Sequence, residues 1–137
     1  MYKVMPTIAP KPTEVSRPFW DACKEHRLIM QQCTACANYI FYPTYMCPCC
    51  GGSDLRWEQV SGRGRIHSVS TVFHPADPVF AQATPYVVAL IQLDEGPVMM
   101  SNIVGEDRLE ARIDDRVEVT FEETGDVTLP RYRRFEA

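Results

Sequence analysis

The chain has 137 residues, of which 45% are hydrophobic and 23% charged, and its formal net charge is −4 at pH 7. This length allows one ordinary domain, or a small module attached to a compact one, and the composition gives no reason to expect long disordered stretches. The acidic balance argues against nucleic acid as the main partner, because affinity for a phosphate backbone comes mainly from Lys and Arg.

The first twelve residues contain three prolines and predict an extended arm, because proline lacks a backbone donor and resists helix formation. They also lack the continuous apolar region of a secretory signal. No stretch of the chain approaches the roughly 20 consecutive apolar residues that a membrane helix requires. We therefore expect a cytoplasmic protein without a membrane partner.

A helix is predicted from residue 13 to about residue 26. Ser16 and Pro18 are residue types that start helices, and Phe19, Ala22 and Cys23 follow at helical spacing on one face. That apolar face needs a surface to pack on.

Two short strands are predicted on either side of a cysteine-rich segment. They are residues 28–33, LIMQQC, and residues 55–60, LRWEQV, with Gly51 and Gly52 turning the chain between them. The cysteine-rich segment is therefore expected to form a hairpin-like module.

Runs rich in β-forming residues follow Ser61 and are separated by turn residues. The run YVVALIQL is apolar almost throughout, which predicts a central strand covered on both sides. In VEVTF apolar and polar residues alternate, which is typical of a strand with one buried and one solvated face. Together the five runs predict a small antiparallel barrel: residues 65–74, 86–93, 98–104, 117–121 and 127–135.

Five of the six cysteines lie within residues 33–50. Two CxxC pairs separated by ten residues are formed by Cys33, Cys36, Cys47 and Cys50. Such pairs on tight turns can aim four sulfurs at one point, as a tetrahedral Zn²⁺ held by four thiolates requires. Because the protein would supply all four ligands, no position is left for water or substrate, and the predicted zinc is structural.

Other interpretations of the cysteines stay open. A tetrahedron of four sulfurs also accepts iron, although nothing in the sequence implies electron transfer. Cys49 could replace Cys50 by pairing with Cys47, but the CxxC spacing is repeated with Cys50. A thioredoxin-type redox pair is disfavoured, because such a pair normally stands alone ahead of a helix. Cys23 is interpreted as a core thiol, with a redox role as the alternative.

No arrangement of residues suited to catalysis is recognised. The sequence contains no P-loop, dinucleotide-binding glycine motif or nucleophile elbow. Two of the three histidines, His67 and His74, lie seven residues apart on one predicted strand, so they would point to opposite faces. We therefore predict that the chain has no catalytic residue.

Two local basic groups are present. Arg63 and Arg65 share one face of a predicted strand, and Arg131, Arg133 and Arg134 lie near the end of the chain. They are interpreted either as a solvated face or as phosphate contacts for a nucleotide-like ligand.

Aromatic residues are concentrated around the predicted helix and the cysteine module. Some must pack the module against the barrel, but surplus aromatics beside prolines are typical of protein interfaces. A core role and an interface role both stay open. The candidate interface residues are Phe19, Trp20, Phe41, Tyr42 and Tyr45.

The order of these segments resembles a family of small proteins, long catalogued as a domain of unknown function. These proteins join an N-terminal helix, a rubredoxin-like zinc ribbon and a C-terminal OB-fold. The resemblance covers nearly the whole chain from about Thr13, and its motifs are PFWDAC, LIMQQCTAC, FYPTYMCPCC, LRWEQVSGRGRIHSVSTV, PYVVALIQLDEG and VTFEE.

The resemblance implies a mostly β fold with an N-terminal helix, a rubredoxin-like zinc ribbon and a five-stranded OB-fold barrel. We assign residues 1–30 to the arm and helix, residues 31–60 to the zinc ribbon and residues 61–137 to the OB-fold domain. The two CxxC pairs match the zinc ligands of the family. Two glycines that the family commonly has at turns are replaced here, one by His26 and Arg27 and one by Asp114 and Asp115.

Members of this family accompany thiolases, ketosynthase-like condensing enzymes or acyl-CoA aldolases. The resemblance therefore implies a non-catalytic subunit that stabilises the larger enzyme and helps form the site or channel for its acyl-CoA. By analogy, two copies would flank a dimeric enzyme in a heterotetramer. The implied cofactors are structural zinc and CoA or acyl-CoA shared with the partner, with Arg63 and Arg65 as candidates to contact the CoA phosphates.

Two other functions stay open at this point. OB-folds and zinc ribbons can bind single-stranded nucleic acid by stacking bases on aromatic residues, although the predicted barrel strands carry few aromatics and little basic charge. The chain could also be a stand-alone carrier of acyl-CoA or a nucleotide.

Overall fold

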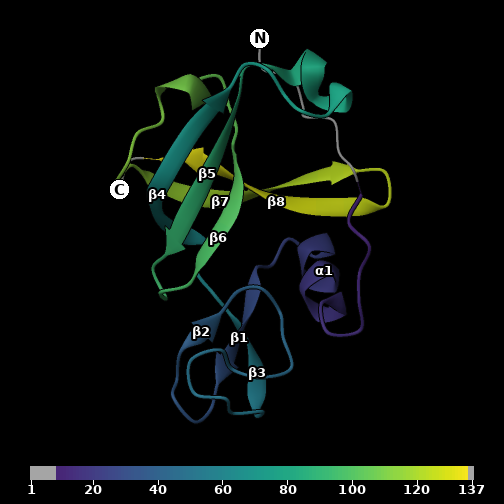
Figure 1. Ribbon diagram of the computed structural model, residues 1–137, viewed down its shortest axis with the longest axis vertical. Helices are drawn as coiled ribbons and strands as arrows, with labels where there is room; N and C mark the ends of the chain where they lie inside the picture. Colours follow the sequence, from purple (N-terminus) through teal and green to yellow (C-terminus); the bar gives the residue numbers. More distant parts are fainter. Residues whose placement is uncertain (1–8, 136–137) are drawn as a thin grey trace.

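A three-stranded sheet and a closed five-stranded barrel lie end to end, with a helix beside their junction (Figure 1). The structure is a computed structural model and describes residues 9–135. The sheet has the order β2 (Tyr39–Ile40), β1 (Ile29–Cys33), β3 (Leu55–Gln59). The barrel has the order β4 (Arg63–Val72), β5 (Tyr86–Leu93), β6 (Val98–Ile103), β8 (Val127–Arg134), β7 (Arg116–Thr124). The helix is α1 (Arg17–Lys24), and the barrel loops contain two short 3₁₀ helices, η1 (Pro78–Ala83) and η2 (Arg108–Glu110).

This architecture confirms the predicted fold class, a mostly β chain with an N-terminal helix and a closed five-stranded barrel. Within residues 9–135 no helix is long and apolar enough to cross a membrane.

Helix α1 is shorter than predicted at both ends. Before it, the Thr13 N–H donates to Ser16 Oγ at 2.8 Å and the Ser16 N–H donates to Thr13 Oγ1 at 3.2 Å. Because these side chains hold the backbone in a turn, the helix begins at Arg17, with Pro18 in its first turn.

The two positions where a glycine is replaced both have the backbone conformation that favours glycine. His26 has φ 58° and Asp114 has φ 72°. The His26 ring also stacks on Phe121, with 5.2 Å between ring centroids, and its Nε2 lies 2.9 Å from Glu123 Oε1. His26 therefore ends the helix and ties that end to β7.

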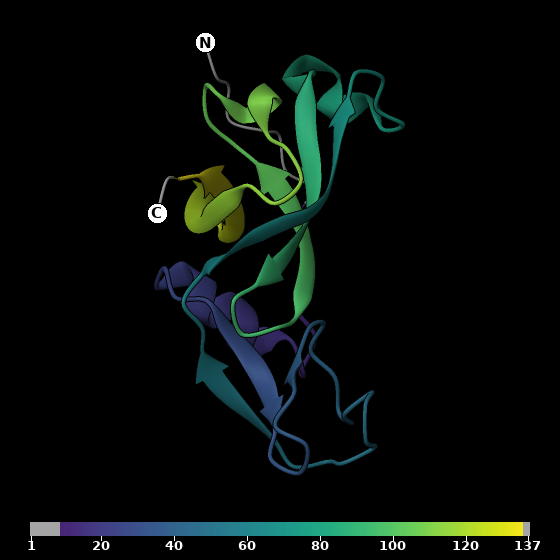
Figure 2. The same ribbon diagram turned by 90° about the vertical axis from the view of Figure 1, so that its left-hand side faces the viewer.

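One hydrophobic core passes through the helix, the sheet and the barrel. It contains Phe19 and Cys23 of α1, Met30 of β1 and Tyr132 of β8, all of them buried. In Figure 2, α1 lies below the β7–β8 hairpin and beside the small sheet. Full burial of a Phe or Met side chain stabilises a fold by about 1.5–3 kcal/mol, so this shared core holds the three parts together.

The barrel is antiparallel except at one seam. Strands β6 and β8 run parallel and meet at the pair Ile103↔Tyr132, whereas the other barrel pairs are antiparallel. The prediction of an antiparallel barrel is therefore wrong at this seam. The physical reason is that β6 and β8 are not neighbours in the sequence, so no hairpin sets their direction.

The prediction that residues 86–93 form a strand covered on both sides is also wrong. Buried residues alternate along β5 with half-buried or exposed ones, and Leu90 is 37% exposed. In a closed barrel one face of each strand points inward and the other points away. Val88 and Leu90 therefore place apolar side chains on the outside of the barrel.

Strands β4 and β5 approach each other closely at Gly64, which pairs with Leu93. A Cβ atom at Gly64 would collide with the Gln92 carbonyl oxygen and lie 3.0 Å from Leu93 Cα. Both contacts are with backbone atoms, which cannot move aside without separating the strands.

We expect Gly64→Ala to lower the free energy of unfolding by about 1–3 kcal/mol, because the added methyl group overpacks this strand pair. Urea denaturation measures the change. Ser68→Ala, at an exposed position of the same strand, is the control and should change the value by less than about 0.5 kcal/mol. Equal unfolding midpoints for the two variants would contradict the close approach.

Candidate functional site

Four cysteine sulfurs converge on one point in the ribbon, the part of the chain that contains β1, β2 and β3. The Sγ atoms of Cys33, Cys36, Cys47 and Cys50 all lie within 4.8 Å of one another. Each CxxC pair lies on the same kind of turn: the Ala37 N–H donates to the Cys33 carbonyl at 2.8 Å, and the Gly51 N–H donates to the Cys47 carbonyl at 2.9 Å. The local backbone of each pair therefore points both sulfurs the same way.

The geometry of this group fits a tetrahedral zinc ion. With metal–sulfur bonds of about 2.3 Å, the sulfur atoms of a tetrahedron lie about 3.8 Å apart. The Cys33–Cys50 and Cys36–Cys47 sulfurs are separated by 3.6 Å. Hydrogen bonds from the backbone N–H groups of Cys50 and Cys49 lower the pKa of the Cys47 thiol to about 6, which favours the thiolate that binds metal.

The two remaining cysteines have different surroundings. Cys49 is exposed, and its N–H donates to Cys47 Sγ at 3.4 Å, but its sulfur is not among the four that converge. Cys23 is fully buried, and this burial raises the pKa of its thiol to about 12. A thiol that stays protonated in an apolar core is consistent with the interpretation of Cys23 as a core residue.

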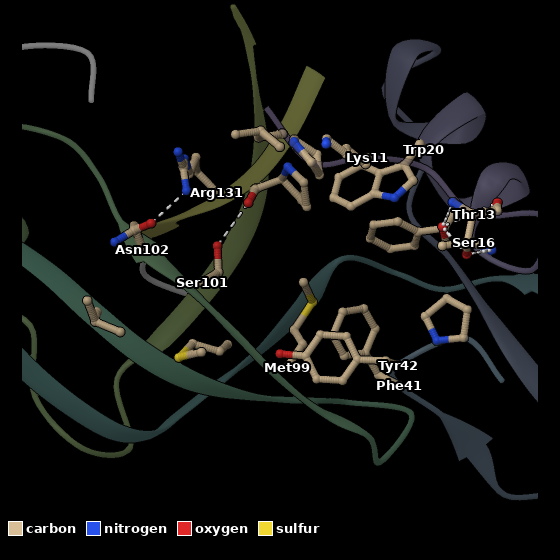
Figure 3. Close-up of a pocket in the computed structure, with 17 residues that line it drawn as sticks. Lys11, Thr13, Ser16, Trp20, Phe41, Tyr42, Met99, Ser101, Asn102 and Arg131 are labelled. Carbon is tan, nitrogen blue, oxygen red and sulfur yellow. Dashed lines mark hydrogen bonds between the residues drawn. The ribbon is translucent and has the colours of Figure 1, made fainter. Parts of the chain in front are cut away.

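A groove of about 540 Å³ lies where the helix, the ribbon and the barrel meet (Figure 3). Aromatic side chains of α1 and the ribbon face sulfur-containing and apolar side chains of β6 and β8 across it. These side chains are Phe19, Trp20, Phe41, Tyr42, Met99, Met100, Leu129 and Pro130.

The barrel side of the groove carries a fixed polar group. Arg131 donates from Nη1 to Asn102 Oδ1 at 2.6 Å and from Nε to Glu122 Oε1 at 3.1 Å. The Arg131 and Glu122 side chains are 12% and 13% exposed. Because Glu122 compensates the charge of Arg131, this arginine attracts an anion only weakly. Its hydrogen bonds to Asn102 and Glu122 instead hold this wall of the groove in place.

The candidate interface aromatics differ in exposure. Phe19 is buried in the core, whereas Trp20 and Phe41 are half-buried, and all three line the groove. Tyr42 is 63% and Tyr45 66% exposed. Their role at an interface stays a prediction.

Gln31 orders the loop that carries these tyrosines, and the sequence interpretation missed it. Its side-chain amide donates to the Thr44 carbonyl at 2.9 Å and accepts from the Thr44 N–H at 2.8 Å. The side chain is buried on β1, so this paired contact satisfies both of its polar ends.

Arg63 and Arg65 do not line the groove. Arg63 lies over the Phe135 ring, 5.5 Å from its centroid. The Arg116 guanidinium, which donates to Asp94, lowers the pKa of that carboxyl together with the more distant Arg65 and Arg63. Contact of Arg63 and Arg65 with a CoA phosphate stays a prediction.

The arginines near the end of the chain are ion-paired. Arg133 pairs with Glu118 at 2.8 Å, and Arg134 pairs with Asp107 and Asp115, each at 3.0 Å. Like Arg131, they therefore have carboxylate partners that reduce their attraction for phosphate.

Family models match both parts of the chain. The model described as "ChsH2, rubredoxin-like zinc ribbon domain" matches residues 20–56. The model described as "ChsH2, C-terminal OB-fold domain" matches residues 57–122. The resemblance predicted from the motifs is thus confirmed.

Two relatives and one solved structure show how much of the chain is shared. A "DUF35 domain-containing scaffold protein" of Methanothermobacter thermautotrophicus is 36% identical over 80% of this chain and 82% of its own length. A "Probable enoyl-CoA hydratase alpha subunit" of Thermomonospora curvata is 40% identical over 64% of this chain, but this chain covers only 27% of that longer protein. A chain of the structure named "Ltp2-ChsH2(DUF35) aldolase" is 32% identical, with a TM-score of 0.80, and the match covers 92% of this chain and 98% of that chain.

We expect Cys33→Ser to lose most of its bound zinc and to unfold the ribbon, because removing one thiolate leaves an incomplete tetrahedron. Metal analysis of the purified protein measures the zinc, with about one ion per chain expected in the unchanged protein. Cys49→Ser is the matched control and should keep its zinc. Loss of zinc from the Cys49 variant and retention by a Cys50→Ser variant would instead assign Cys49 as the fourth ligand.

Proposed function

Because the chain belongs to the ChsH2 (DUF35) family, whose members join a rubredoxin-like zinc ribbon to an OB-fold, we propose that it is a non-catalytic accessory subunit of an acyl-CoA enzyme. Its partner would be a thiolase-like subunit that forms or cleaves a carbon–carbon bond, as a thiolase or an aldolase does. The catalytic residues would then lie on that partner.

One observation carries the proposal. The likeness to a chain of an Ltp2–ChsH2 aldolase extends over almost the full length of both chains. The names of two relatives support it: one is called a scaffold protein, and the other is called a probable enoyl-CoA hydratase alpha subunit. The exposed aromatic side chains beside the groove also suit a subunit that is covered by a larger protein.

In this function the zinc has a structural role. Cys33, Cys36, Cys47 and Cys50 would hold it, and the bound ion would crosslink the two CxxC turns. Zinc binding contributes on the order of 10 kcal/mol to the folding of small zinc modules, enough to fix loops that have little core of their own. The ribbon would thereby present Phe41, Tyr42 and Tyr45 in a fixed arrangement.

The finer parts of the proposal concern the complex. Two copies of this chain would flank a dimeric enzyme in a cytoplasmic heterotetramer. The subunit would stabilise the enzyme and form part of the site or channel for the acyl-CoA. Arg63 and Arg65 would contact CoA phosphates at a site that the partner completes.

The isolated chain is expected to show no turnover of acyl-CoA substrates, measured as release of the CoA thiol. A tagged chain purified from its native cytosol should bring down a thiolase-like or aldolase subunit in equal amount. Detectable turnover by the isolated chain would contradict the accessory role, as would recovery with nucleic acid in place of an enzyme.

We expect replacement of Arg63 and Arg65 by Ala to weaken CoA binding to the complex about tenfold, because two charged hydrogen-bond donors to phosphate are lost. Isothermal titration calorimetry measures the affinity. Arg133→Ala is the control, since Arg133 is an exposed arginine of the same barrel that pairs with Glu118. Unchanged affinity in the double variant would remove these two residues from the CoA site.

A further inference from the structure

The groove follows the seam between β6 and β8, where the strand pairing of the barrel is shortest. Among the described residues, β6 and β8 are registered at a single pair, Ile103↔Tyr132. Residues 99–102 of β6 and residues 129–131 of β8 form one wall of the groove, and Met99, Ser101, Asn102 and Arg131 of this wall are labelled in Figure 3. The seam therefore leaves part of the β6 strand edge outside the pairing of the closed barrel.

Pro130 accounts for the end of this pairing. Continuing the parallel ladder by two residues would place Ser101 beside Pro130, whose N–H would donate to the Met100 carbonyl. Proline has no N–H. Instead the Ser101 hydroxyl donates to the Pro130 carbonyl at 2.8 Å. The ladder therefore stops at a proline, in the way that prolines protect or interrupt strand edges elsewhere.

Two hydrogen bonds fix the direction in which the β6 backbone groups face. The Leu93 N–H on β5 donates to the Pro97 carbonyl at 2.9 Å, and the Val104 N–H donates to the Tyr132 carbonyl on β8 at 2.8 Å. The β5–β6 register between these bonds is unbroken, and facing alternates along an antiparallel strand. Residues 98 and 100 therefore direct their backbone N–H and carbonyl groups into the seam, and the β6–β8 register of the described residues does not include them.

The surface around this edge is apolar and exposed. Across the outside of β5 and β6, Leu90 pairs with Met100, and these side chains are 37% and 54% exposed. Val98 is 38% exposed on the same face, and Tyr42 borders the opposite side of the groove. A small ligand in the groove would leave this outer face uncovered, whereas a protein segment continuous with a larger surface would cover it.

The chain as a whole is acidic, but the charged side chains that line the groove are basic. The chain carries a net charge of −4, yet the groove lining, as far as residues 9–135 form it, includes Lys11 and Arg131 and no carboxylate. Arg131 is compensated by Glu122, whereas Lys11 has no ion pair within residues 9–135. A complementary occupant is therefore apolar with an acidic side chain near Lys11.

We propose that this groove binds an extended apolar segment of the partner enzyme subunit, which adds as a strand along β6 and places an acidic side chain near Lys11. This inference rests on the proposed function, because it assumes the partner enzyme subunit. Main-chain hydrogen bonds to residues 98 and 100 would supply the strand pairing, and side chains of the segment would contact Trp20, Phe41 and Tyr42.

The first test compares two variants in binding to the thiolase-like or aldolase subunit purified with the unchanged chain. We expect Met100→Glu to weaken binding at least about tenfold, because it puts a carboxylate where the segment is apolar and acidic. Ile113→Glu is the matched control, since Ile113 is 62% exposed and does not line the groove. Both sites are exposed, so both variants should fold and keep their zinc.

The second test is hydrogen exchange of the intact complex against the isolated chain. Strand addition predicts slower exchange of the Met100 amide when the enzyme subunit binds. Pro130→Ala restores the missing N–H, so β6 and β8 should pair further and binding of the enzyme subunit should weaken without a loss of thermal stability.

The outcomes separate this inference from the proposed function. If the enzyme subunit binds but Met100→Glu binds as well as the control, or if the Met100 amide is unprotected in the complex, the inference is overturned and the accessory role stands. Protection of Met100 by acyl-CoA alone would overturn it too, because the ligand would then be the occupant. If the unchanged chain recovers no acyl-CoA enzyme, the proposed function and this inference both fail.

Discussion

The shared hydrophobic core between α1, β1 and the base of the barrel is the constraint on which the rest of this molecule depends. Phe19 and Cys23 from the helix, Met30 from the ribbon and Tyr132 from the barrel are buried in one cluster. The ribbon has only a small cluster of its own, formed by Cys33, Ile40 and Cys47. A module of this size does not bury enough apolar surface to fold alone, so it needs both a metal and the neighbouring core.

The groove exists because this core fixes the three parts relative to one another. Its walls come from residues far apart in the sequence, such as Trp20, Phe41 and Met99. Gln31 adds to this order by holding the ribbon loop through two hydrogen bonds to Thr44. Loss of order in any one part would therefore change the groove, even where no groove residue is altered.

Apolar surface and charge are distributed in a way that suits a protein partner better than a phosphate backbone. The outer faces of β5 and β6 carry Leu90, Val98 and Met100, which water contacts in the isolated chain. The arginines near the end of the chain, in contrast, are held by carboxylates. Covering the apolar area of such a surface with a protein partner lowers the free energy. The same surface has little cationic charge to bind a nucleic acid.

The sequence by itself determined the features that depend on local spacing. Two CxxC pairs predict four converging sulfurs because each pair needs only its own turn, and alternation within VEVTF predicts a strand because side chains alternate along any strand. Only the tertiary structure decided which apolar residues face outward on β5, that β6 and β8 run parallel, and that Pro130 lies opposite Ser101 at the seam between these two strands. These features depend on how distant segments pair and close into a barrel, and neither hydrophobic periodicity nor composition carries that information.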